Sequence, residues 1–295
     1  MRILYRGQAC AALVTVGLVT GLAAIQAGTL AAPLQDAKEE QKSELKPDVA
    51  ALLKQSTDVY KQMKSYRHTA KWSISVKGPE GDVHEDLTFT LALERPNRFA
   101  YKMDSKSQFF PPVAAYCDGT TFINFKAKGQ PTPTREYTKT KAPAGYKGIN
   151  IVDDVEFQPI ATYIIALMLQ GDALADKDVR AAMEKATVKP PVTENGKKWQ
   201  VLEMPFGSEG VPIDLYIGQD DHLIGKATQL PGKPAPQGDT KITEVVDSIK
   251  INQPIEANTF QYVLPADAKQ VERFSAPQRP NDARLSTRGS RVARR

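Results

Sequence analysis

Histidine, cysteine and carboxylate side chains are the first candidates for chemistry, because they supply most metal ligands, nucleophiles and proton carriers. The chain has 3 histidines. His84 lies beside Glu85 and Asp86, but no second histidine or cysteine stands at metal-ligand spacing from it. Residues 153–156 (DDVE) offer carboxylates without the glycine-centred loop of an EF-hand. Both segments are therefore interpreted as solvated surface charge, with no metal site.

Cys117 is the one cysteine that follows the N-terminal segment, and no obvious base lies near it in the sequence. Its position in a strand-like stretch before a turn favours a buried structural thiol over a nucleophile. The sequence contains no Gly-x-Ser-x-Gly elbow, no phosphate-binding loop and no dinucleotide fingerprint. Nothing in it supports an enzyme or a cofactor, although a hydrolase assembled from distant residues stays open as an alternative.

Residues 1–31 have the layout of a secretory signal peptide. Arg2 and Arg6 precede an apolar stretch at residues 11–25, and small residues lead to an expected cleavage site after Ala31. The apolar stretch is interrupted by glycines and is short for a membrane span. We expect an exported, periplasmic protein, with an uncleaved N-terminal anchor as the alternative.

The rest of the chain divides into three parts. Residues 32–48 are polar and charged and predict a flexible lead-in. Residues 49–274 predict one domain, and residues 275–295 predict a disordered basic tail. Much of the net charge of +5 comes from arginines near the C-terminus, so it does not indicate nucleic-acid binding.

The hydrophobic pattern of the domain changes between two periods. Apolar residues at helical spacing predict a first helix from Val49, with Asp48 as its N-cap. Further helices are expected at residues 160–169 and 176–185. Alternation of apolar and polar residues predicts strands at residues 70–76, 87–93, 99–103, 113–117, 121–126, 135–139, 199–204, 212–217, 223–229, 241–250 and 259–264. The expected fold is α+β, with one large antiparallel sheet.

Three segments resemble the LolA/LolB-like superfamily, including the related periplasmic proteins labelled DUF2092. Residues 93–99 (LERPNRF) are similar to a family strand that ends in Arg-Pro-Asn and an aromatic residue. Residues 116–122 (YCDGTTF) are similar to the family's Asp-Gly hairpin. Residues 258–265 (NTFQYVLP) are similar to its closing strand and turn. The resemblance covers residues 49–274 and depends on the order and spacing of the three segments.

The resemblance implies an incomplete β-barrel, in which a curved antiparallel sheet surrounds a hydrophobic cavity and helices cover it. Known members carry the lipid part of lipoproteins across the periplasm, bind lipids or glycolipids, or sense misfolded envelope proteins. A sheet with one apolar face needs such a cover, and any space left beneath the helices suits acyl chains. The resemblance therefore implies a binding protein or carrier for a hydrophobic ligand, without enzymatic activity or a cofactor.

By position, Arg95 matches the arginine that holds the lid of the lipoprotein carrier closed by bonding to lid backbone. A guanidinium has five donors in a fixed fork, so it can hold several carbonyl groups at once. The chain departs from the carrier in its longer N-terminal lead, its extra residues 126–148 and its basic tail, and Glu94 stands where the carrier has a lysine. These departures favour general apolar-ligand binding over lipoprotein transport.

The helix at residues 160–169 is apolar on nearly all sides, and it is either a core helix or a lid over the cavity. Sheet residues of the inward face would form the opposite wall. The candidate ligand-binding residues are Trp72, Phe89, Leu91, Leu93, Arg95, Phe99, Tyr101, Ile164, Ile165, Leu167, Met168 and Leu215.

The expected partner is a lipid or an acylated protein. The alternative function is an envelope interaction or sensor module, with the same fold, a filled core and a protein partner. The Arg-rich tail is either a contact to an anionic surface or a solubilising end. Its arginines are Arg273, Arg279, Arg284, Arg288, Arg291, Arg294 and Arg295.

Overall fold

The computed structural model describes residues 44–78, 81–107, 110–128, 134–142, 159–174, 176–206, 210–229 and 239–274. The expected signal peptide, nearly all of the lead-in, the DDVE segment and the basic tail from residue 275 lie outside the described residues. No helix of the described part is both long and apolar enough to cross a bilayer.

In the part of the chain that the structure describes, three α-helices accompany one sheet: α1 (Pro47–Gln62), α2 (Ile160–Leu169) and α3 (Lys177–Glu184). A short 3-10 helix, η3 (Ala257–Phe260), follows the last long strand. The strands are β1 (Ser65–Gly78), β2 (Gly81–Glu94), β3 (Arg98–Asp104), β4 (Val113–Asp118), β5 (Thr121–Lys128), β6 (Thr134–Lys141), β7 (Thr187–Glu194), β8 (Lys197–Phe206), β9 (Val211–Gly218), β10 (Ile224–Gln229), β11 (Asp239–Ile251) and β12 (Lys269–Gln270).

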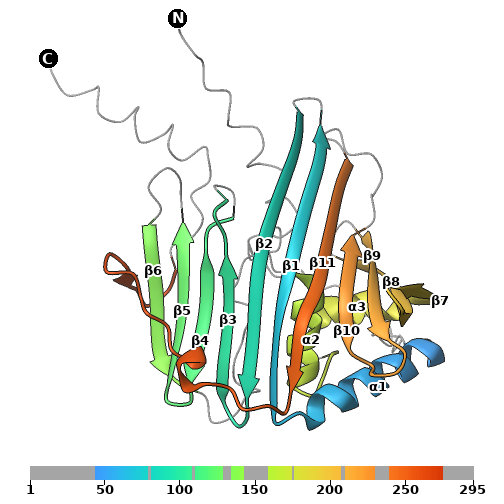
Figure 1. The fold of residues 1–295 in the computed structure, drawn as a ribbon, viewed down its shortest axis with the longest axis horizontal. Helices are drawn as coiled ribbons and strands as arrows, with labels where there is room; N and C mark the ends of the chain where they lie inside the picture. Colours follow the sequence, from blue (N-terminus) through green and yellow to red (C-terminus); the bar gives the residue numbers. More distant parts are fainter. Residues whose placement is uncertain are drawn as a thin grey trace, which may run out of the picture.

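The described strands form one open sheet in the order β12-β6-β5-β4-β3-β2-β1-β11-β10-β9-β8-β7. Neighbouring strands pair antiparallel, except that β12 runs parallel to β6. β1 and β11 pair over most of their length and join the two halves of the sheet (Figure 1). Along the chain, β1–β6 precede α2 and α3, and β7–β11 follow them. The expected α+β fold with one large, unclosed, helix-covered sheet is confirmed.

The two faces of the sheet have different covers. The three helices lie behind the half that contains β11, β10, β9 and β8, while the chain after β11 crosses the other face toward β6 (Figure 1). Beneath the helices lies the larger apolar core, which draws on both halves of the sheet. Beneath the crossing segment lies a smaller cluster that includes Tyr116, Phe125, Phe260 and Tyr262. We call the helix-covered side the inner face and the other side the outer face.

Both edges of the sheet are protected against pairing with another chain. β12 adds two residues to the β6 edge. At the other edge, β7 carries Pro190 and Pro191, which have no N–H to offer, and its register with β8 shifts between Lys189 and Val192. Sequence reasoning missed β7, because a pair of prolines reads as a loop.

Two expectations were wrong: the N-cap of the first helix, and the strand at residues 259–264. Asp48 is not the N-cap of α1, because the helix begins at Pro47 and Lys46 occupies the cap. Proline is favoured at the first helical position, where its missing N–H has no partner to lose. The strand expected at residues 259–264 is instead η3 followed by irregular chain. Phe260 and Tyr262 both pack into the outer-face cluster, so the sequence alternates as a strand does. The segment forms no strand, because its alternation comes from side-chain packing and not from pairing in the sheet.

Gly225 of β10 lies directly against the indole ring of Trp199 on β8. A Cβ atom at this buried position would lie 2.3 Å from Cη2 and 2.6 Å from Cζ3 of Trp199. Gly225→Ala must therefore displace the ring, and we expect it to lower the free energy of unfolding by about 1–3 kcal/mol. Urea unfolding measures this effect. Combining it with Trp199→Phe, which shortens the ring, should cost less than the sum of the two single changes.

Candidate functional site

The apolar candidates come together as the sequence predicted. All of them except Arg95 belong to the inner-face core, where each is less than a tenth exposed. The sheet residues interlock, since the ring of Trp72 lies 5.8 Å from Phe89 and 5.7 Å from Phe110, measured between centroids. α2 closes over this cluster, with Ile164, Ile165 and Met168 fully buried. Contact of these residues with a ligand stays a prediction.

Arg95 lies just after β2 and connects the two long helices. Its Nε donates to the carbonyl oxygen of Met63 at 2.8 Å, directly after α1. Its Nη2 donates to Leu169 O, at the last residue of α2, at 2.7 Å and to Lys61 O at 3.3 Å. The carbonyls at a helix C-terminus have no partner within the helix and carry partial negative charge. One guanidinium therefore caps α1 and α2 together, which we call the arginine latch.

The first turn of α2 is held by a second residue, Glu244 of β11, which sequence reasoning missed. Its Oε2 accepts from Ala161 N at 2.7 Å, and its Oε1 accepts from Thr162 N at 2.9 Å. The Thr162 hydroxyl also donates to Oε1 at 2.6 Å. Glu244 is 1% exposed, and among the described residues no lysine or arginine forms an ion pair with it.

A row of buried polar side chains continues from Glu244 under both helices. His68 Nε2 lies 3.2 Å from Thr162 Oγ1, and His68 Nδ1 lies 2.9 Å from the Tyr66 hydroxyl. Tyr66 bonds to Tyr60 of α1, which in turn accepts from Ile224 N at 3.0 Å. We call Tyr60, Tyr66, His68, Thr162 and Glu244 the polar row.

Donor directions along the row follow from its ends. With Glu244 ionised, the Thr162 proton is given to the carboxylate, so the threonine oxygen accepts from His68 Nε2–H. His68 Nδ1 then accepts from the Tyr66 hydroxyl. The buried groups are thus satisfied in one direction, from Ile224 N–H to the carboxylate.

Burial sets the protonation of the row. Desolvation raises the pKa of Glu244 to about 7, although its hydrogen bonds from Thr162 and Ala161 act in the opposite direction. Desolvation also lowers the pKa of His68 to about 3, so the imidazole stays neutral in the folded protein at neutral pH. Burial raises the pKa values of Tyr60, Tyr66 and Tyr101, which therefore remain neutral.

The sequence did carry a signal for this row. Glu244 alternates with Ile242 and Val246 on the inner face of β11, so a carboxylate stands at an inward position. Thr162 likewise interrupts an apolar helix. Polar residues at core positions are costly unless they are paired, and such pairing appears only once helix and strand are placed together.

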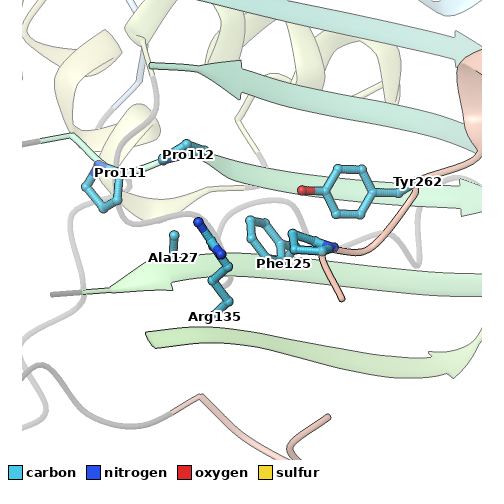
Figure 2. Close-up of a pocket in the computed structure, with 7 residues that line it drawn as sticks. Pro111, Pro112, Phe125, Ala127, Arg135 and Tyr262 are labelled. Carbon is cyan, nitrogen blue, oxygen red and sulfur yellow. The ribbon is translucent and has the colours of Figure 1, made fainter. Parts of the chain in front are cut away.

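A pocket of about 320 Å³ lies on the outer face, away from the predicted site (Figure 2). Its apolar wall includes the rings of Phe125 and Tyr262, and Arg135 reaches toward its centre (Figure 2). Arg135 is neutralised by Asp267, with Nη1 at 2.6 Å from the carboxylate. The pocket is lined by Pro111, Pro112, Phe125, Ala127, Arg135, Tyr262 and Pro265, and none of the predicted ligand residues is among them.

The chemistry-bearing residues of the sequence take ordinary structural positions. Cys117 is a buried free thiol, and burial raises its pKa, which disfavours the nucleophilic thiolate. His84 bonds to Ser75 at 3.1 Å on the exposed outer face of the β1–β2 hairpin and contacts Asp86 at 3.3 Å. Within the described residues, no group of three histidine, cysteine or carboxylate residues could hold a metal ion.

The open, mainly antiparallel sheet, covered on one face by helices that an arginine after β2 holds together, is the arrangement that the LolA-like resemblance implied. The chain belongs to the family described as "Predicted periplasmic protein (DUF2092)", which it matches over residues 49–273. The resemblance found in the sequence is thereby confirmed.

Several solved structures are similar to the chain at low sequence identity. The lipoprotein LppX from Mycobacterium tuberculosis shares 13% identity, with a TM-score of 0.36 over 72% of this chain and 98% of that one. The LolA superfamily protein NE2245 from Nitrosomonas europaea shares 9%, with a TM-score of 0.29 over 72% and 97%. The MucA/MucB complex of Pseudomonas aeruginosa shares 11% identity, with a TM-score of 0.39 over 76% of this chain and 63% of the matched chain. At such low scores these similarities carry no functional argument, and no curated protein matches the chain.

Proposed function

We propose that the protein is an exported, periplasmic binding protein or carrier for a hydrophobic ligand, a lipid or the acyl chains of a lipoprotein. The ligand lies between the inner face of the sheet and α2, in place of contacts that the helix makes in the closed form. No cofactor and no catalysis are involved.

The arginine latch is the observation that carries this proposal. α2 buries an apolar surface against the sheet, yet its last carbonyl is held by a single polar side chain from outside the helix. Hydrogen bonds of this kind can be broken and re-formed without disturbing the sheet, whereas the cluster beneath α2 offers a mainly apolar surface beside the polar row once exposed. A cover held by few polar bonds over such a surface suits a site that admits an apolar guest.

A second candidate is an envelope interaction or sensor module with a protein partner. It is favoured by the close packing of the inner face, where Phe89, Leu91 and Leu93 are fully buried in the closed form. In this case α2 stays in place, and a partner binds the outside of the molecule.

Quenching by a dibrominated stearic acid separates the two candidates, because bromine quenches tryptophan only at near contact. Trp72 belongs to the inner-face core, whereas Trp199 lies four strands away, roughly 19 Å, on β8. We expect quenching in the Trp199→Phe variant, which retains Trp72, and little in Trp72→Phe, which retains Trp199. Native mass spectrometry of protein purified gently from its own envelope, followed by lipid extraction, should identify a bound lipid.

Equal quenching of both variants would place the fatty acid outside the predicted site. A protein that is free of lipid and also fails to bind the fatty acid would contradict the carrier proposal. That result would favour the interaction module.

A further inference from the structure

The caps of α2 differ between its two ends. At the C-terminus, the N–H groups of Gln170, Gly171 and Asp172 bond to the carbonyls of residues 166–168, whereas the N-terminus has no side-chain cap from its own segment. The sequence of α2, IATYIIALML, contains no charged residue, and Pro159 at its N-cap position has no side-chain hydrogen bond to offer. The first N–H groups and the last C=O groups of a helix have no partner within it. Since α2 is buried along nearly its whole length, the N–H groups of its first turn and the Leu169 carbonyl need partners from the surrounding protein.

Glu244 and Arg95 meet this need at opposite ends. The carboxylate accepts from the N–H groups of Ala161 and Thr162, and the guanidinium donates to the carbonyl of Leu169. The two ends are about 15 Å apart for a helix of 10 residues. Negative charge at the N-terminus and positive charge at the C-terminus both complement the helix dipole.

The Glu244 contact differs from an ordinary surface cap in its connections. Through Thr162 it continues into His68 and Tyr66, and from there to Tyr60 of α1. Arg95 reaches α1 as well, at Lys61 and Met63. Each end of α2 is therefore connected both to the sheet and to α1.

We propose that Glu244 is the second positioning residue of the ligand site, and that ligand exchange requires release of α2 from Glu244 as well as from Arg95. The inference rests on the proposed function. Glu244 holds the first turn of α2 against β11, the latch holds the last turn against β2, and the helix leaves the sheet only when both ends are released.

Amide hydrogen exchange on the ligand-free chain tests the two ends separately. In Glu244→Gln, the substituted side chain presents an NH₂ group where a second acceptor oxygen stood, so one N–H of the first turn loses its partner. We expect exchange of the Ala161 and Thr162 amides to rise about tenfold or more, while Gln170 and Gly171 change little. Arg95→Met should give the reverse pattern. Arg98→Met, which removes an ion pair with Glu94 and a contact with Phe260 on the outer face, should change neither end selectively.

Dissociation of the brominated fatty acid then tests exchange. Both single variants should release it faster than the unchanged protein, and their effects should multiply in the double variant, because both contacts must break before the ligand leaves and the two ends are far apart. Arg98→Met should leave the release rate unchanged. A double variant that is no faster than the faster single variant, or a Glu244→Gln variant that behaves like Arg98→Met, would overturn the proposal.

The two proposals fail in different ways. If the chain does not bind the fatty acid, the carrier function is contradicted, while the end-specific amide exchange still decides whether Glu244 positions α2. If the fatty acid binds but Glu244→Gln leaves the first-turn amides unchanged, only the second anchor is contradicted.

Discussion

Replacing Arg95 with methionine is expected to lower the free energy of unfolding by about 2–4 kcal/mol and to loosen α1 and α2 together. The methionine side chain keeps apolar volume but donates no hydrogen bond. It leaves the carbonyls of Met63, Leu169 and Lys61 without their charged donor. Urea unfolding gives the stability, and amide exchange at the ends of both helices gives the local effect.

Arg98 supplies the matched control, three residues further along the chain. It pairs with Glu94 at 2.7 Å and lies over the ring of Phe260 at 4.5 Å, so it serves the outer face. Arg98→Met should leave α1, α2 and fatty-acid release unchanged. Arg95→Lys should be intermediate, because an ammonium retains the charge but lacks the planar fork that reaches three carbonyls. Equal effects of Arg95→Met and Arg98→Met on α2 would contradict the latch.

The second large effect concerns pH, since Glu244 and His68 oppose each other. The pKa of Glu244 is raised from 4.5 to about 7 in the folded protein. This raised pKa contributes stability that is fully present below pH 4.5 and is lost as pH rises through 7. The pKa of His68 is lowered from 6.5 to about 3, so its contribution is present above pH 6.5 and is lost as pH falls toward 3. Between pH 4.5 and 6.5 the free energy of unfolding falls with pH because of Glu244 and rises with pH because of His68, and the two changes cancel.

Glu244→Gln should remove one side of this balance. Only His68 then titrates in the row, because burial raises the pKa values of the facing Tyr66 and Tyr101 and keeps them neutral. Relative to the unchanged protein, the variant should lose about 3 kcal/mol of stability as pH falls from 6.5 to 4.5, at about 1.4 kcal/mol per pH unit. His68→Gln should do the opposite and gain stability over the same interval.

Urea unfolding at pH 4.5, 5.5, 6.5 and 7.5 measures these slopes for the three proteins. Differences from the unchanged protein matter here, because exposed carboxylates contribute equally to each profile. A Glu244→Gln profile parallel to that of the unchanged protein would mean that Glu244 remains ionised, with its three donors outweighing desolvation.

The fold was accessible from the sequence wherever burial follows a simple period. The alternation in β2 and the apolar run of α2 gave both the elements and their inward residues. β1 and β2 extend beyond the predicted limits, because their pairing continues into polar residues near the turn and, for β1, through residues 65–69 at the opposite end. β7 was hidden by Pro190 and Pro191, and the alternation after Thr259 belongs to a segment that packs without pairing.

The residues of the site also divide into those that the hydrophobic pattern predicts and those that it does not. Apolar candidates such as Phe89 and Ile165 follow from the pattern, because any inward residue of these elements joins the core. Arg95 followed from the family resemblance, and its three carbonyl contacts agree with the predicted latch. Glu244 and His68 did not follow, because their partners come from elements that are distant in the sequence.

α2 has one more property, which follows from the origin of its caps. A helix of 10 residues is marginal in water even with good end groups, and both ends of α2 are completed by β-sheet and turn residues. Once separated from Glu244 and Arg95, the segment has little reason to remain helical. In the proposed carrier, opening the site would therefore be a local melting of α2 and closing would be its refolding on the sheet, which serves as the template for the helix that covers it.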